Sequence, residues 1–180
     1  MKSMKKIELI NNLTLTISQA STNDASQIVD FLNSVAGETD YLTFGENEFP
    51  FSVQEEEAII KECLEKNLCL MLVGKIENEI VSQLFLQRSS KPRVAHIGDI
   101  GISVSKKYWR LSIGKHMMLA AIDWARNNGV TKLQLQVRVD NERAIQLYKK
   151  LGFVIEGTIA RAIKIDGAYF DEYSMGLQLS

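Results

Sequence analysis

The sequence predicts a mixed α/β fold of the α+β kind, a twisted and mostly antiparallel sheet with helices on both faces. Short segments of alternating apolar and polar residues recur along the chain, separated by amphipathic stretches with helical spacing. Two pairs of turn-forming residues, Glu77-Asn78 and Asp166-Gly167, each join neighbouring alternating segments. The expected elements do not alternate strictly between strand and helix, which argues against a doubly wound nucleotide-binding fold.

The N-terminal part is expected to form one strand and two helices. The strand lies near 13–17, where every second residue is apolar. Residues 24–36 place apolar side chains at helical spacing, and Gly37 is expected to end this helix. A long loop at 38–51 leads to a second helix at 53–66, whose first turn holds three glutamates that complement the helix dipole.

The central part is expected to form three strands and a long helix. Two strands, 68–75 and 79–87, flank the first tight turn, and a third strand follows at 94–104. Residues 112–128 carry an apolar stripe typical of a helix, including Trp124, which is expected to lie in the core. Gly129 is a natural stop for this helix.

The C-terminal part is expected to add a strand, a helix and a hairpin. Residues 133–139 alternate, and 141–151 place apolar residues at i, i+3, i+4 and i+7 before Gly152. Two final strands flank the second tight turn. Because no linker, repeat or low-complexity segment is visible, residues 1–180 are expected to form a single domain.

Composition excludes several functional classes. The 180 residues are 46% apolar and carry a net charge of −1, which argues against a nucleic-acid partner. No apolar run reaches transmembrane length, and the apolar part of residues 1–10 is too short for a secretory leader, so we expect a cytoplasmic protein without a membrane partner. Cys63 and Cys69 are then expected to be reduced core thiols.

The remaining general expectations concern metals and assembly. His96 and His116 have no further ligand at helical or hairpin spacing, so no metal is expected. Both are expected to be structural or surface residues. Dimers are the commonest oligomers of soluble proteins, which makes a homodimer the assembly to consider.

The segment Ile100–His116 is expected to form a strand end, a short loop and the first turn of a helix. Unpaired main-chain N–H groups and the helix dipole meet there and form an anion site suited to a pyrophosphate. Arg110, Lys115 and His116 add cationic side chains, and Gly114 allows a close approach of the main chain. Taken alone, the segment is equally compatible with an ordinary strand-to-helix junction.

A second segment, 139–153, carries the pattern N-x-x-A-x-x-L-Y-x-x-x-G-F. The matching residues are Asn141, Ala144, Leu147, Tyr148, Gly152 and Phe153. With this pattern the chain resembles the GCN5-related N-acetyltransferase (GNAT) superfamily over about 13–178, most strongly at 100–178. Glu156-Gly157-Thr158 and the last hairpin are similar to the branch that includes ribosomal-protein and polyamine acetyltransferases. The resemblance implies a GNAT-like acyl-CoA N-acyltransferase fold.

The resemblance also implies where acetyl-CoA would bind. It places the pantetheine arm against the main chain of Ile102, Ser103 and Val104. The family's pyrophosphate loop, [Q/R]-x-x-G-x-[G/A], falls on Trp109, Arg110, Leu111, Ser112, Ile113 and Gly114, with Lys115 alongside. Trp109 stands where the pattern has Gln or Arg, and Ser112 stands for the first glycine. The Ser112 hydroxyl is expected to cap the following helix, and Asn141 to cap its own helix and contact the cofactor.

Acetyl transfer to an amine needs a neutral nucleophile, whereas an amine with a pKa of about 10.4 is almost fully protonated at neutral pH. A carboxylate is therefore expected as base. Asp99 is the first candidate, and an exposed strand carboxylate is the alternative. The resemblance assigns Tyr148 to the CoA sulfur, and a packing tyrosine is the alternative.

Other acidic residues are candidates for acceptor binding. Glu38 and Asp40 lie in the region that the family uses for the acceptor. A further group of glutamates is expected to form a solvated face, although it could also attract a polycation; it comprises Glu46, Glu48, Glu55, Glu56 and Glu57.

The expected activity is transfer of the acetyl group of acetyl-CoA to a primary amine by direct attack in a ternary complex. A polyamine, a protein N-terminus, and an amino-sugar or antibiotic amine all remain open as acceptors, and another short acyl-CoA remains open as donor. The alternative is a non-catalytic acyl-CoA-binding regulatory module. A nucleotide-binding regulatory domain is disfavoured by the hairpin-rich order of elements.

Overall fold

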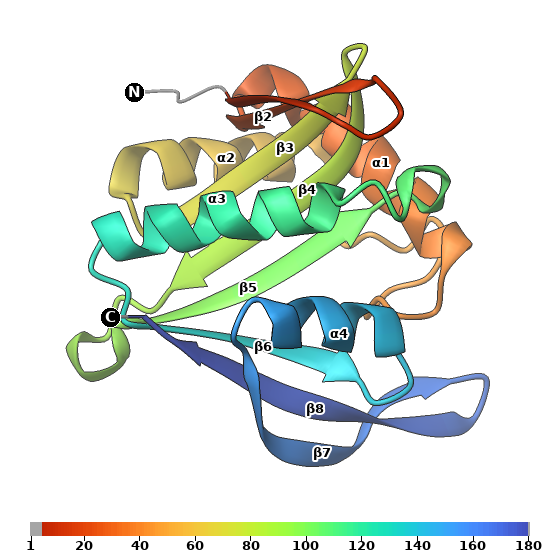
Figure 1. Ribbon diagram of the computed structural model, residues 1–180, viewed down its shortest axis with the longest axis vertical. Helices are drawn as coiled ribbons and strands as arrows, with labels where there is room; N and C mark the ends of the chain where they lie inside the picture. The colour runs from red at the N-terminus through yellow and green to blue at the C-terminus, as the bar shows by residue number, and fades with distance from the viewer. Residues whose placement is uncertain (1–4, 180) are drawn as a thin grey trace.

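The computed structural model describes residues 5–179 and contains a mixed sheet with helices on both faces (Figure 1). The sheet has eight strands within these residues, in the order β1-β2-β3-β4-β5-β6-β8-β7, and only β5 and β6 pair in parallel. The strands are β1 (Lys5–Glu8), β2 (Thr14–Gln19), β3 (Cys69–Ile76), β4 (Glu79–Arg88), β5 (Ile97–Val104), β6 (Lys132–Arg138), β7 (Val154–Ile165) and β8 (Ala168–Gln178). The α-helices are α1 (Ala25–Glu38), α2 (Val53–Lys66), α3 (Ile113–Asn127) and α4 (Glu142–Lys150). The predicted fold class is confirmed.

Two apolar clusters hold the helices to opposite faces of the sheet. Helices α3 and α4 bury side chains such as Met117 and Ile145 in the larger cluster, together with strand residues such as Leu84. Helices α1 and α2 bury Ile28 and Ile60 in the smaller cluster on the other face. Because the chain alternates sides along each strand, one sheet supplies apolar residues to both clusters.

Both predicted hairpins are present, and their turn residues explain them. Glu77 and Asn78 have φ of 50° and 70°, and Asp166 and Gly167 have φ of 48° and 83°. Two successive left-handed residues form the type I′ turn whose twist matches that of the flanking strands. These turns fix the β3–β4 and β7–β8 pairings.

Several predicted boundaries are wrong. Strand β1, which pairs with β2, was not expected, because its four residues are mostly exposed and show little alternation. Helix α1 continues through Gly37 to Glu38, and the missing side chain at Gly37 makes room for Glu46, whose Cδ would lie 3.1 Å from a Cβ there. The strand expected from residue 94 begins at Ile97, because Pro92–Val94 form a 3₁₀ turn.

The expectation of two reduced thiols is also wrong, since Cys63 and Cys69 form a disulfide. Helix α2 is followed by Asn67, which has a left-handed conformation with φ of 52°. This residue reverses the chain and brings the two Cα atoms to 4.8 Å, within disulfide range. The covalent link therefore joins the end of α2 to the start of β3. Among the described helices, none has the length and apolar character needed to cross a bilayer.

The start of α2 is fixed by a capping box. The Glu55 N–H donates to the Ser52 hydroxyl at 3.3 Å, and the Ser52 N–H donates to the Glu55 carboxylate at 2.7 Å. Ser52→Ala should lower the free energy of unfolding by about 1 kcal/mol, because the cap bond is lost. Urea titration followed by circular dichroism measures this change.

Ser34→Ala is the matched control, because Ser34 is exposed within α1. Its free energy of unfolding should stay within about 0.5 kcal/mol of the parent value. Equal losses in the two variants would contradict the assignment of Ser52 as a cap.

Candidate functional site

The sheet opens between β5 and β6. Their parallel ladder holds only three residue pairs, which join Ile97–Asp99 to Lys132–Gln134. Beyond this point β5 continues to Val104 against β4 alone, and β6 continues to Arg138 against β8 alone. Figure 1 shows the two strands diverging from a common end. Main-chain groups on the facing strand edges are thus left without a sheet partner.

A large cleft of about 1840 Å³ runs through this opening. On one side it is lined by the start of α3 and by α4, and on the other by α2 and the loop of residues 39–51. Ile102, Ser103 and Val104, the residues expected along the pantetheine arm, lie on the open edge of β5 and line the cleft. Such an opening can receive an extended chain that pairs with main-chain groups.

The loop between β5 and α3 presents a series of unpaired N–H groups. The helical hydrogen bonds of α3 begin at His116, whose N–H donates to the Ser112 carbonyl at 3.1 Å. Within residues 5–179, the N–H groups of Gly114 and Lys115 have no main-chain acceptor. Arg110 and Ser112 have left-handed φ of 68° and 61° on either side of Leu111, and such alternation forms a concave anion site.

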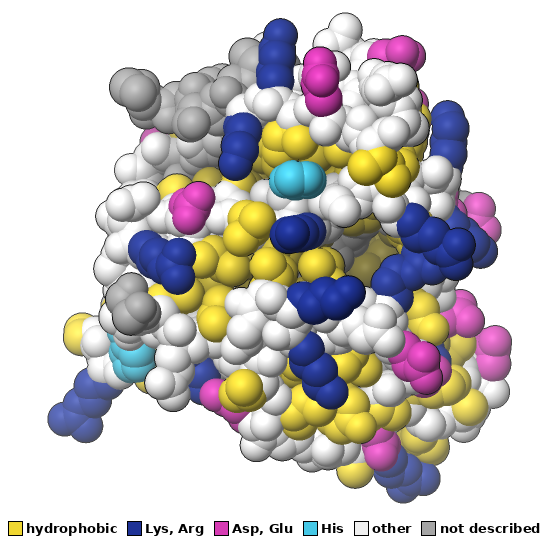
Figure 2. Space-filling model, viewed as in Figure 1, with side chains coloured by type: hydrophobic (Ala, Val, Ile, Leu, Met, Phe, Trp, Pro, Cys, Tyr) yellow, Lys and Arg dark blue, Asp and Glu magenta, His cyan; other side chains and the backbone are white. Residues whose placement is uncertain are grey.

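Basic side chains surround this loop. Figure 2 shows several Lys and Arg side chains around a hollow between the start of α3 and α4. Arg110, Lys115, Arg143 and Lys150 line the cleft there. His116 adds little charge, because burial lowers the pKa of its ring and favours the neutral form. The site therefore suits a polyanion with several phosphate oxygens.

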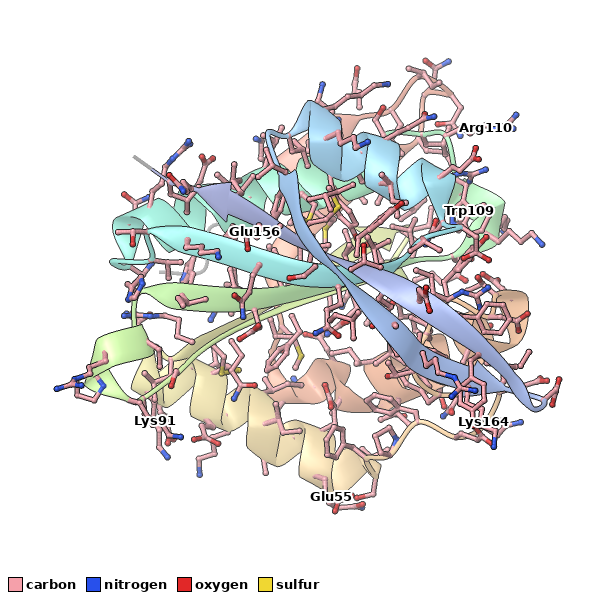
Figure 3. The ribbon with its side chains drawn as sticks, turned by 90° about the horizontal axis from the view of Figure 1, so that it is seen from below. Glu55, Lys91, Trp109, Arg110, Glu156 and Lys164 are labelled. Atoms are coloured by element: carbon pink, nitrogen blue, oxygen red, sulfur yellow. A yellow bond between two sulfur atoms is a disulfide. The ribbon has the colours of Figure 1, made fainter. Side chains whose placement is uncertain are left out.

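Trp109 anchors the loop. Its indole N–H donates to the Val104 carbonyl at 2.8 Å, and the Arg143 guanidinium stacks 4.2 Å from the ring centroid. Figure 3 shows Trp109 and Arg110 together on the loop beside α4. These two contacts join the end of β5 to α4. Trp109 therefore holds the loop of the anion site in place.

Gly114 and Ser112 are constrained in different ways. A Cβ at Gly114 would lie 3.2 Å from Leu147 Cδ2, so the missing side chain lets α3 approach α4 closely. The predicted cap at Ser112 is wrong, because its hydroxyl makes no capping bond. An N-cap side chain normally works from an extended backbone, whereas Ser112 is left-handed, a conformation that favours glycine.

Tyr148 projects from α4 into the cleft. The residue is only 8% exposed, and its ring packs on Phe153 with centroids 5.8 Å apart. Burial raises the pKa of its phenol to about 12, so the hydroxyl keeps its proton at neutral pH. No residue in 5–179 accepts a hydrogen bond from this hydroxyl. Asn141 caps α4 as predicted, since its side chain accepts from the Ala144 N–H at 3.3 Å.

The predicted acidic residues lie in different surroundings. Asp99 is at the last paired position before the gap, lines the cleft, and accepts from the Gln134 amide at 2.7 Å. Glu38 accepts from the Lys106 N–H at 2.7 Å and the Ser105 hydroxyl at 3.3 Å, so its carboxylate holds the loop after β5. Asp40 offers its carbonyl to Arg138 at 2.9 Å. Among the described residues, Asp99 lines the cleft but Glu38 and Asp40 do not.

Two buried carboxylates in the cleft were not expected. Glu56 is 2% exposed and Glu172 is 8% exposed, and burial raises the pKa of both, although Arg138 partly lowers that of Glu172. The predicted solvated face is therefore correct for the four exposed members of its group but wrong for Glu56. Glu56 shares the buried stripe of α2 with Ile60 and Cys63, at i, i+4 and i+7, and this spacing was the available clue.

Arg138 was also missed. It is 6% exposed, stacks 3.8 Å from the centroid of the Phe170 ring, and donates to both carboxylate oxygens of Asp140. This buried guanidinium lines the cleft from the end of β6 and joins it to the loop before α2 through the Asp40 carbonyl. In the described chain, no group of three or more His, Cys, Asp or Glu side chains is arranged to hold a metal ion.

Similarities to known proteins match this architecture. A family model described as the acetyltransferase (GNAT) family matches residues 38–153. The crystal structure of an acetyltransferase of the GNAT family from Streptococcus pneumoniae superposes with a TM-score of 0.89 and 32% identity, covering 92% of this chain and 99% of that one. A Salmonella typhimurium putative acetyltransferase, solved with acetyl-CoA, shares the fold with a TM-score of 0.81, 18% identity, and coverage of 92% and 94%.

Sequence relatives cover shorter stretches. An L-amino acid N-acetyltransferase of Escherichia coli is 35% identical over 108 residues, which is 58% of this chain and 65% of that enzyme. The [ribosomal protein bS18]-alanine N-acetyltransferase of Escherichia coli is 42% identical over 95 residues, which is 53% of this chain and 58% of the relative. The chain thus covers less than two thirds of the length of these two relatives.

Because Ser112 is left-handed, Ser112→Gly should raise the free energy of unfolding by about 0.5–1 kcal/mol, despite the greater flexibility of an unfolded glycine. Urea titration of the purified variant measures the change. Ser90→Gly, at an exposed loop position without positive φ, should lower stability instead. A loss of stability in Ser112→Gly as large as that in Ser90→Gly would count against a strained serine.

The buried phenol of Tyr148 gives a second expected outcome. Alkaline titration followed by tyrosinate absorbance should show one ionisation near pH 12 that is missing from Tyr148→Phe. Because the folded pKa lies above the ordinary value of about 10, the contribution of the neutral phenol to stability is complete below pH 10 and lost as pH rises through 12. Loss of an ionisation near pH 10 instead of near pH 12 in the variant would show that Tyr148 ionises earlier.

Proposed function

The chain belongs to the GNAT family of acetyltransferases, and from this premise we propose that it transfers the acetyl group of acetyl-CoA to a primary amine by direct attack in a ternary complex. The observation that carries this proposal is the cleft itself. It is lined by an anion site with basic side chains, by an open strand edge and by Tyr148, whose hydroxyl has no partner within the described residues. These features lie in the order needed by a long anionic thioester whose reactive end lies beside a phenol.

The residues present fit acetyl-CoA. The N–H groups of Gly114 and Lys115, with the side chains of Arg110 and Lys115, would bind the pyrophosphate. Open-edge main-chain groups of Ile102–Val104 would pair with the pantetheine amides. Asn141, at the start of α4 and in the cleft, would contact the same arm. When bound, acetyl-CoA supplies an activated acyl group and a thiolate leaving group.

The protein's own groups would then manage two protons. Asp99, at the point where the gap begins, is the proposed base for the acceptor's ammonium, directly or through water. Tyr148 is the proposed donor of a proton or hydrogen bond to the departing sulfur, because its phenol is protonated at neutral pH and has no acceptor within the described residues. The neutral amine would attack the thioester carbonyl, and the C–S bond would break while Tyr148 supplies a proton or hydrogen bond to the sulfur. The nitrogen would lose its second proton as the amide forms, and this proton, passed on through water, would restore any proton that Tyr148 had given up.

The acceptor would enter from the α1–α2 side of the sheet. The cleft there is lined by Phe44, Phe49 and other residues of the loop before α2. Relatives named for amino acids and for a ribosomal protein support an amine acceptor of this kind. Glu38 and Asp40, at the start of this loop, are proposed to shape the acceptor side by holding neighbouring segments in place.

The proposal predicts that Tyr148→Phe lowers kcat about 100-fold, because proton donation to the leaving group is lost, with little change in the KM for acetyl-CoA. Release of free thiol, measured with acetyl-CoA and a panel of primary amines, gives both constants. Tyr169→Phe is the control, because this tyrosine is exposed at the start of β8. Unaltered turnover in Tyr148→Phe would remove Tyr148 from the mechanism. Tight CoA binding without thiol release from any amine would instead support a regulatory module.

A further inference from the structure

Glu56 is a buried residue whose carboxylate has no protein partner and opens on the cleft. It is 2% exposed, lines the cleft, and takes part in no side-chain hydrogen bond or ion pair within residues 5–179. The cleft lining also includes apolar side chains of the adjoining cluster, among them Phe44, Phe49 and Ile59. A carboxylate in such surroundings is costly unless a cation joins it, and its place in the first turns of α2 offsets only part of that cost.

The position of Glu56 separates it from the reacting centre. Helix α2 packs on β3, and β3 is two strands from β5 in the sheet. Strand spacing puts β3 about 10 Å from β5 across the sheet. Glu56 therefore lines the same cleft as Asp99 and Tyr148 but reaches it from α2, away from the strand gap.

Arg88 and Arg138 also line the cleft, and both are engaged by other parts of the protein. Arg88 donates to the carbonyls of Ala95 and Asn128, and Arg138 is bound by Asp140. The Arg138 charge is compensated by Asp140, and Arg88 donates two of its N–H groups to carbonyls, whereas the Glu56 carboxylate has no protein partner and can bind a second ammonium.

We propose that Glu56 binds the distal ammonium group of a small diamine, whose other amino group is acetylated at the strand gap. The proposal rests on the acetyltransferase function and names the class of its acceptor. The unpaired carboxylate recognises the charge, and the apolar walls contact the methylene chain between the two nitrogens. A monoamine of equal length fills the same walls but leaves Glu56 without a partner.

The test compares cadaverine, a five-carbon diamine, with pentylamine on the full-length protein. The parent protein should show at least a tenfold higher kcat/KM for cadaverine, which reflects one buried charge-assisted hydrogen bond. Glu56→Gln should bring this ratio close to one, and calorimetry with CoA present should show at least tenfold weaker cadaverine binding. Its Tm should stay level or rise, because an unpaired buried charge is removed. The matched control is Glu57→Gln, an exposed neighbour, which should keep the parent ratio.

The outcomes separate the two proposals. An equal preference for both amines in the parent protein, or a retained preference in Glu56→Gln, overturns the role of Glu56. A Tm lowered by several degrees with the ratio kept would make Glu56 structural and also overturns it. An L-amino acid used better than cadaverine overturns the diamine class. Glu56-dependent cadaverine binding without thiol release from any amine would sustain this inference while the acetyl-transfer proposal fails.

Discussion

The three-rung ladder between β5 and β6 is the constraint on which the site depends. Both strands stay in the sheet because each keeps an antiparallel partner on its outer side, β4 for one and β8 for the other. The sheet can therefore open without losing its core, and the opening creates unpaired main-chain groups beside an apolar interior. Unpaired main-chain groups lower the stability of the protein without ligand. They can also bind an extended ligand whose amide groups are complementary to them.

Two left-handed residues and two unpartnered polar groups lie along this cleft. Arg110 and Ser112 take left-handed conformations in the loop, and the Tyr148 hydroxyl and the Glu56 carboxylate have no partner within the described residues. A chain optimised only for stability would replace these features with glycine or apolar residues. Their coincidence in one cleft is therefore an argument for function that does not depend on family resemblance.

Local patterns in the sequence predicted much of the fold. The hairpins at Glu77-Asn78 and Asp166-Gly167 are confirmed because the turn residues themselves determine the pairing, and the segment from Asn141 to Phe153 correctly indicated the family. The strand opening could not be predicted, because it depends on how far two distant segments stay paired. Glu56 was misjudged because it lies among exposed glutamates, and only its spacing with Ile60 separates it from them.

The Glu38 carboxylate joins two segments that are 68 residues apart in the chain, the end of α1 and the loop that leads to α3. A hydrogen bond thus connects the segment that would select the amine to the segment that would bind the nucleotide end of the donor. An exchange between homologues that reaches back from the 39–51 segment into the end of α1 must therefore retain this glutamate. A graft that omits it would disturb donor affinity while appearing to change only acceptor preference.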